Sequence, residues 1–176
     1  MNINRSNPDD TTMFLDEANT AQQYADELKA QGVDRVILLS HYGYDNDLAL
    51  AQNTSGIDII VGGDSHSLLG DLSDLGLKPS GSYPTMVSDA SGNDVCVVTA
   101  WQYSQIVGEL HAEFDGQGNI TSCMGTPHMM LADSFKEKML TGKELKLKMA
   151  TAMQFIMSSK STRPYRLLSR MQMHKR

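Results

Sequence analysis

The chain has 176 residues and a formal net charge of −6, which is enough length for one ordinary domain and too little for two large ones. All Asp and Glu residues lie within residues 1–159, which form an acidic body, whereas the segment from Lys160 to Arg176 is rich in Lys and Arg and contains no acid. An acidic body excludes a nucleic-acid-binding domain, and no stretch approaches the roughly 20 apolar residues of a membrane span. We therefore expect neither a nucleic acid nor a membrane as a partner.

The first third of the chain has the pattern of an α/β fold. Apolar residues at helical spacing predict an amphipathic helix over residues 13–30. The short apolar runs at 36–39 and 57–61 are typical of strands that are buried on both faces. Between them, Asp45 or Asn46 is expected to begin a short helix that continues through Ala51. The order helix, strand, helix, strand predicts a pair of parallel strands.

The pattern changes after His66. A loop rich in Gly and Ser extends to Tyr83, and turn residues then separate several short strand-like runs. We predict three or four antiparallel strands here, within residues 85–88, 94–101, 105–114 and 120–123. Near the C-terminus, residues 143–157 have apolar positions at helical spacing, and no periodicity follows them.

Two loops carry residues that could do chemistry, and each follows one of the predicted buried strands. The first contains His41, and the second contains Asp64 and His66 after two consecutive glycines. Because parallel strands end at the same edge of a sheet, we expect the ligand atoms of these three side chains to lie within about 4–7 Å of one another. Two imidazoles and a carboxylate suit a divalent metal ion. The alternative is that the histidines are surface groups and the Gly-Gly-Asp segment is an ordinary turn.

Residues 32–43 and 58–67 resemble two blocks of the calcineurin-like metallophosphatases, specifically those of the periplasmic 5′-nucleotidase and UDP-sugar hydrolase branch. The segment between these blocks also fits, as does the run from Tyr83 to Leu110, so the resemblance extends over about residues 10–140. It implies part of a four-layer α/β sandwich, with parallel strands and helices followed by antiparallel strands.

The resemblance also implies an activity and a cofactor. Members of this family hydrolyse a phosphoester or pyrophosphate of a nucleotide with two divalent ions, and Zn, Mn, Co and Mg are not distinguishable here. By position, His41 would bind one ion and His66 the other. Asp64 stands where the family most often has a histidine, and its carboxylate keeps a ligand there. The family works in the periplasm or is secreted.

Several parts of the family pattern are not found in this sequence. The N-terminal metal-binding blocks are missing, as is the nucleoside-binding domain. We therefore expect residues 1–142 to be the C-terminal half of a catalytic domain, followed by a helix and basic tail of uncertain status at 143–176. No catalytic residue is assigned. The alternative is a catalytically silent fragment or interaction module that retains half a metal site.

Two cysteines and the N-terminus bear on the compartment. Residues 1–5 lack the apolar core of a signal peptide, so the chain taken as it stands is expected to stay in the cytoplasm. Cys96 and Cys123 do not have zinc-site spacing. Both fall in strand-like runs, and the family is exported, so we predict that they lie close enough to bridge. Two buried free thiols are the equal alternative.

A half-domain would leave part of its sheet uncovered. The side chains expected at this surface are Ile37, Leu39, Ile59 and Val61. We predict self-association, pairing with a missing N-terminal half, or coverage by residues 145–157. Among the remaining side chains, Trp101 and Tyr103 are expected in the core rather than stacked on a base. His111 is expected to be exposed, and His128 and His174 have no assigned role.

Overall fold

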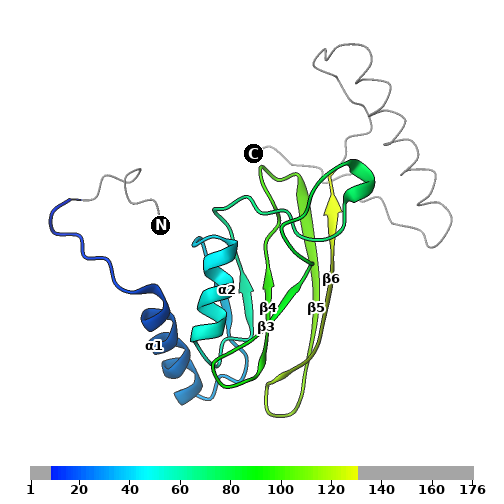
Figure 1. The fold of residues 1–176 in the computed structure, drawn as a ribbon. Coiled ribbons are helices and arrows are strands. Elements are labelled where there is room, and N and C mark those ends of the chain that lie inside the picture. The colour runs from blue at the N-terminus through cyan, green and yellow to red at the C-terminus, as the bar shows by residue number, and fades with distance from the viewer. Residues whose placement is uncertain (1–8, 131–176) are drawn as a thin grey trace, which may run out of the picture. The chain divides into compact units, whose positions relative to one another are not determined.

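The computed structural model describes residues 9–130 (Figure 1). The predicted helix at 143–157, the basic tail and His174 lie outside these residues. Contacts divide the chain into two units, and the described part of the smaller unit is residues 72–77, which contain a single 3-10 turn, η2 (Ser73–Leu75). All other elements belong to the larger unit, and no helix among the described residues is long and apolar enough to cross a membrane.

A mixed four-stranded sheet forms the centre of the larger unit. Its strands, in spatial order, are β1 (Ile37–Leu39), β2 (Ile59–Val61), β4 (Asp94–Val98) and β3 (Thr85–Ser88). The first three are parallel, and β3 is antiparallel to β4. The prediction from the sequence that residues 94–101 pair only with antiparallel strands is wrong, because β4 is parallel to β2. Val95 through Val98 are all buried, and such a continuous apolar run does not reveal the direction of the neighbouring strand.

Two helices pack on one face of this sheet. α1 (Glu17–Ala30) begins later than predicted, because the Asp16 side chain accepts the Asn19 N–H at 2.8 Å and caps the helix there. α2 (Tyr44–Asn53) begins directly after Gly43, which provides no side-chain cap, and not at Asp45 or Asn46. The core between the helices and the sheet contains Ala25, Leu50, Ala51, Ile60, Val95 and Val97.

A long hairpin packs on the other face (Figure 1). It consists of β5 (Ile106–Phe114) and β6 (Ile120–Met129), paired in antiparallel register. β6 continues well beyond the predicted end at residue 123, so His128 lies in this strand, opposite Val107. Pro127 lies within β6, because each strand of a two-stranded sheet has an open edge that tolerates a residue without an N–H.

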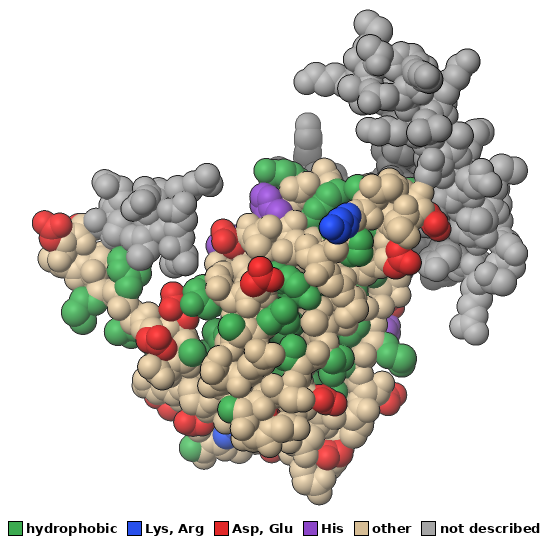
Figure 2. Space-filling model, viewed as in Figure 1, with side chains coloured by type: hydrophobic (Ala, Val, Ile, Leu, Met, Phe, Trp, Pro, Cys, Tyr) green, Lys and Arg blue, Asp and Glu red, His purple; other side chains and the backbone are tan. Residues whose placement is uncertain are grey.

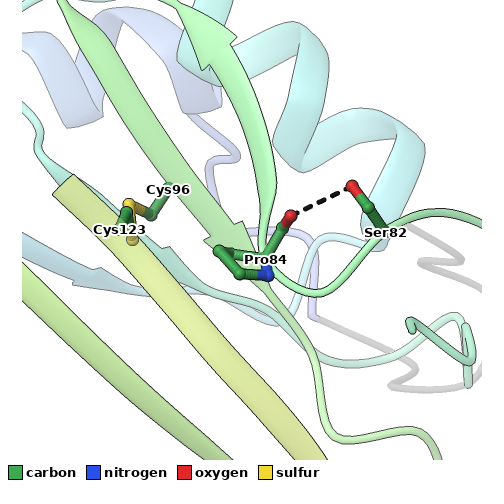
Figure 3. The surroundings of a disulfide bond; sticks show 4 residues. All are labelled: Ser82, Pro84, Cys96 and Cys123. Atoms are coloured by element: carbon green, nitrogen blue, oxygen red, sulfur yellow. Dashed lines mark hydrogen bonds between the residues drawn. A yellow bond between two sulfur atoms is a disulfide. The ribbon is translucent and has the colours of Figure 1, made fainter. Parts of the chain in front are cut away.

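A disulfide joins the hairpin to the sheet. Cys96 of β4 and Cys123 of β6 are bonded, with their Cα atoms 6.6 Å apart (Figure 3). Cys96 belongs to a small apolar cluster with Ile59 and Ile120, and Cys123 packs against this cluster. The prediction that the two cysteines bridge is confirmed, and the alternative of two free thiols is wrong. Figure 3 also shows the start of β3, where the Ser82 hydroxyl donates to the Pro84 carbonyl at 3.0 Å.

The edge strand β1 leaves part of the sheet uncovered. Ile37 is 58% exposed, Leu39 78% and Val61 38%, and no strand among residues 9–130 pairs with the outer side of β1. Ile59 is 6% exposed, because the hairpin covers it, so the predicted apolar surface forms from three of the four expected side chains. On the face drawn in Figure 2, acidic side chains are scattered among apolar ones and basic ones are few, as expected for an acidic body.

Candidate functional site

Three loops leave the same edge of the sheet. Since β1, β2 and β4 are parallel, the segments that follow them, residues 40–43, 62–67 and 99–105, emerge side by side at the carboxyl ends of the strands. This edge is where open α/β sheets place their sites. The first two loops were predicted to carry the site. The third was missed, because β4 was assigned to the antiparallel group.

The first two loops bring His41 and Asp64 together, as predicted. His41 Nε2 lies 3.6 Å from Asp64 Oδ1, and both side chains are exposed. Two ligands of one ion, each bonded at about 2 Å, lie roughly 3 Å apart. The pair is therefore close to the separation that a shared divalent ion would impose.

His66 is placed differently from His41 and Asp64. Its ring stands edge-on against the ring of Tyr103 in the third loop, with the ring centroids 5.1 Å apart and an interplanar angle of 65°. Within residues 9–130, no group of three His, Cys, Asp or Glu side chains is arranged to hold a metal ion. The approach of His66 to the other two residues, and a metal role for each of the three, therefore stay predictions.

Unusual backbone geometry concentrates in the second and third loops. Non-glycine residues with positive φ, as far as the chain is described, are confined to these two segments: Asp64, His66, Trp101, Tyr103 and Ser104, with φ between 50° and 69°. Such conformations are uncommon for residues with a side chain and are often found at functional sites. Tyr103 is 76% exposed, so its predicted place in the core is wrong, whereas Trp101 is half-buried.

The two glycines of the second loop provide space. Neither Gly62 nor Gly63 has a positive φ, so their contribution is the absence of a side chain. A Cβ atom at Gly63 would lie 3.0 Å from His41 Nδ1, and one at Gly62 would overlap Asp47 Oδ2. Gly63 therefore lets the His41 side chain of the first loop approach the second loop closely, and Gly62 does the same for the Asp47 side chain of α2.

Asp47 is a buried carboxyl group beneath the two loops. It lies in the first turn of α2 and has no exposed surface. Its Oδ1 accepts the Ser40 hydroxyl at 2.5 Å, whereas Oδ2 has no hydrogen-bond partner among the described residues. Burial raises the pKa of Asp47 above its usual value, and the Ser40 hydrogen bond opposes this shift. In the sequence, this residue resembles an ordinary acid in the first turn of a helix.

Backbone and hydroxyl contacts also join the first two loops. The Ser40 N–H donates to the Val61 carbonyl at 2.9 Å. The Tyr44 N–H, at the start of α2, donates to Ser65 Oγ at 3.0 Å, and Ser65 Oγ lies 2.9 Å from Ser67 Oγ. The loops that carry His41 and Asp64 are therefore held to each other by several hydrogen bonds.

A second cluster of histidines lies on the hairpin. His111 Nε2 and His128 Nε2 each lie 2.7 Å from one oxygen of Glu109. The hydrogen bond from His111 lowers the pKa of Glu109 most, and the hydrogen bond from His128 lowers it further. His111 is exposed, as predicted. None of these residues belongs to the three loops at the sheet edge.

Known proteins are similar to this chain in sequence. A probable 5′-nucleotidase of Treponema pallidum is 42% identical over 138 residues, which cover 77% of this chain and 23% of that protein. An NAD 5′-nucleotidase of Haemophilus influenzae is 38% identical over 132 residues, which cover 74% of this chain and 22% of that protein. No protein-family model matches the sequence.

Solved structures agree with these relatives. A 5′-nucleotidase precursor from Thermus thermophilus superimposes with a TM-score of 0.68 at 37% identity, over 88% of this chain and 30% of that one. The Haemophilus influenzae NAD nucleotidase gives a TM-score of 0.70 at 35% identity, over 88% of this chain and 28% of that one. These structures confirm the predicted α/β fold and its resemblance to the metallophosphatase sandwich. The chain spans about a quarter of the length of the curated relatives that it matches.

Proposed function

The chain belongs to the 5′-nucleotidase family, and from this premise we propose that it forms part of a metal-dependent phosphohydrolase that acts on a nucleotide. The observation that carries the proposal is the approach of His41 Nε2 to Asp64 Oδ1, 3.6 Å apart at the carboxyl edge of parallel strands. An imidazole nitrogen and a carboxylate oxygen in that arrangement suit Zn²⁺, Mn²⁺ or Co²⁺.

The residues present would supply part of a metal centre. His41 and Asp64 would hold one divalent ion, and His66 would bind the second ion of the proposed pair. A bound ion there would polarise a phosphoryl oxygen and lower the pKa of a water molecule. The His41 ring lies close against Gly63, and the Asp64 carboxylate adds negative charge beside it. Three ligands do not complete a two-ion centre, so the others would come from the part of the relatives that this chain does not span.

The proposal is tested by phosphate release and metal binding together. The 176-residue chain, with AMP and Mn²⁺, Co²⁺ or Zn²⁺, is expected to release phosphate far more slowly than a full-length relative, since general acid–base catalysis alone contributes about 10²–10⁴-fold. It should still bind Mn²⁺, and His41→Ala should weaken that binding, whereas His111→Ala on the hairpin should not. Robust turnover that His41→Ala abolishes would show that the chain is complete, and failure of the unsubstituted chain to bind any of the three ions would refute the metal site.

A catalytically silent interaction module is the second candidate. The observation that favours it is the exposed apolar surface beside β1, formed by Ile37, Leu39 and Val61. Such a surface at an open sheet edge is suited to association with another polypeptide. If adding a polypeptide that carries the remaining family segments restores phosphate release, the enzyme proposal holds. If it binds without restoring activity, the interaction module is favoured.

The disulfide supports a place outside the reducing cytosol. Disulfides persist in oxidising compartments and are rare in the cytosol, and Cys96 is bonded to Cys123. We therefore propose a periplasmic or secreted setting for the working protein. Thiol titration of protein recovered from an oxidising compartment, under denaturing and non-reducing conditions, should find no free thiol. Two free thiols in that sample would count against this setting.

A further inference from the structure

We propose that Asp47 is a positioning residue that holds the two loops carrying His41 and Asp64 in place. The structural part of this proposal stands by itself, and its consequence for metal binding rests on the proposed function. The assignment follows from three features of the carboxyl group: its burial, its hydrogen bond to one loop and its packing against the other.

The first contact fixes the loop after β1. Asp47 Oδ1 accepts the Ser40 hydroxyl at 2.5 Å, and Ser40 Oγ in turn accepts the Tyr42 N–H at 3.2 Å. Ser40 and Tyr42 are the two neighbours of His41 in the chain. The single carboxyl group therefore orients the backbone on both sides of the His41 side chain.

The second contact fixes the loop after β2. Asp47 Oδ2 lies so close to Gly62 that a side chain at that position would overlap it. Gly62 is itself anchored, because its N–H donates to the Val98 carbonyl of β4 at 2.7 Å. Asp64 lies two residues further along the chain. The carboxyl group of Asp47 thus fills the space between the two loops and sets their separation.

Ordinary core packing does not account for this carboxyl group. Burying an oxygen without a hydrogen-bond partner costs free energy, and an apolar side chain of similar volume would avoid that cost. A Leu or Met at residue 47 could fill the space but could not accept the Ser40 hydroxyl. Because Asp47 is fully buried and Asp45 in the same helical turn is exposed, Asp45 provides a matched control for the loss of an acid.

Backbone dynamics of the metal-free 176-residue chain test the structural part. In Asp47→Ala, the ¹⁵N order parameters of His41 and Asp64 should fall from about 0.85 to below about 0.6, the range of flexible backbone. Asp45→Ala should leave them unchanged. Asp47→Asn should keep the order parameters of both residues high, because the amide keeps an acceptor for the Ser40 hydroxyl and the volume beside Gly62. A folded Asp47→Ala chain with unchanged order parameters at both residues overturns the proposal.

Two further variants keep the test decisive if Asp47→Ala does not fold. Ser40→Ala removes only the first contact, so the order parameter of His41 should fall while that of Asp64 stays high. Gly62→Ala forces a methyl group against Asp47, so Asp64 should respond more strongly than His41. If both variants fold and neither residue responds, Asp47 does not position the loops.

Mn²⁺ binding, followed by electron paramagnetic resonance, tests the functional part. Residues that orient metal ligands typically change metal affinity by about 10–100-fold, so Asp47→Ala should raise the Kd for Mn²⁺ by such a factor and Asp45→Ala should not. If the unsubstituted chain binds no Mn²⁺, the proposed metal function fails, while the order parameters still decide the role of Asp47. If the loops loosen in Asp47→Ala but the Kd is unchanged, the assignment of Asp47 to the metal site is overturned.

Discussion

The N–H of Tyr44, the first residue of α2, donates to the side chain of Ser65 in the neighbouring loop at 3.0 Å. The residue before α2, Gly43, has no side chain with which to cap the helix, so Ser65 satisfies a donor that has no partner within the helix. Ser65→Ala should therefore lower the free energy of unfolding by about 1 kcal/mol. Ser67→Ala, which removes a neighbouring hydroxyl but not this bond, should cost less. Urea denaturation of the three chains measures the difference, and equal midpoints for the two variants would contradict it.

The disulfide should contribute substantially to stability. It links residues that are 27 positions apart, and a loop of this length corresponds to about 3.5 kcal/mol on the chain-entropy account. Adding a reductant should therefore lower the urea midpoint of the unsubstituted chain. The double variant Cys96→Val with Cys123→Ala serves as the control, since its midpoint should not respond to reductant. A reduced chain as stable as the oxidised one would show that the bond adds nothing.

The Glu109 cluster should make part of the stability depend on acid pH. Its hydrogen bonds with His111 and His128 lower the pKa of Glu109 in the folded protein below the ordinary value of 4.5. A carboxyl group with a lowered folded pKa stabilises the fold above its unfolded pKa, and this contribution is lost as the pH falls through the folded pKa. The difference in urea midpoint between the unsubstituted chain and Glu109→Gln should therefore shrink as the pH falls below about 4.5. Glu113→Gln, at an exposed position of the same strand, is the control, and a difference that stays constant with pH would refute the assignment.

The apolar surface beside β1 should promote association. Ile37 and Leu39 are exposed on an edge strand, where unpaired backbone groups add to the tendency to pair with another chain. Sedimentation should show dimers or larger species, and Ile37→Ser with Leu39→Ser should reduce them. Met124→Ser is the control, because this side chain is also exposed but lies on the hairpin.

A different outcome would indicate that another segment covers this surface. A soluble monomer that binds no hydrophobic dye would contradict open exposure and would leave coverage by residues 145–157 as the explanation. Deleting residues 143–176 from such a monomer should then expose the surface. If the deletion changes neither dye binding nor sedimentation, both forms of the prediction fail.

Local sequence patterns predicted the elements well where burial has a clear period. The helical spacing before Ala30 and the apolar runs that contain β1 and β2 were identified, with ends that moved by a few residues. Strand direction was less accessible. Since all of β4 beyond its first residue is buried, its sequence contains no alternation to show which neighbours it has, and it was grouped with the wrong strands.

The candidate site was predictable only where it depends on topology. His41 and Asp64 meet because their strands are parallel neighbours, which the order of elements already indicated. Asp47 resembled an acid in the first turn of a helix, a position where acids are common and usually exposed. In the fold, Asp47 contacts the hydroxyl of Ser40 on the preceding loop and the backbone of Gly62 on the next one, and the helical pattern of α2 reveals neither contact. Tyr103 was expected in the core, and its position at the same sheet edge was not recognised because β4, which precedes its loop, had been grouped with the antiparallel strands.

The central position of β4 also has a consequence for synthesis of the chain. Ile59 in β2 pairs with Cys96 in β4, which the ribosome adds only after the whole intervening segment. Until then, β2 has only β1 beside it, and the apolar side chains of both faces lack the strand and hairpin that later cover them. Unfinished chains of this kind expose hydrophobic surface and unpaired strand edges, which makes them prone to aggregation. We therefore expect the nascent protein to need a chaperone most between completion of β2 and emergence of the β5–β6 hairpin.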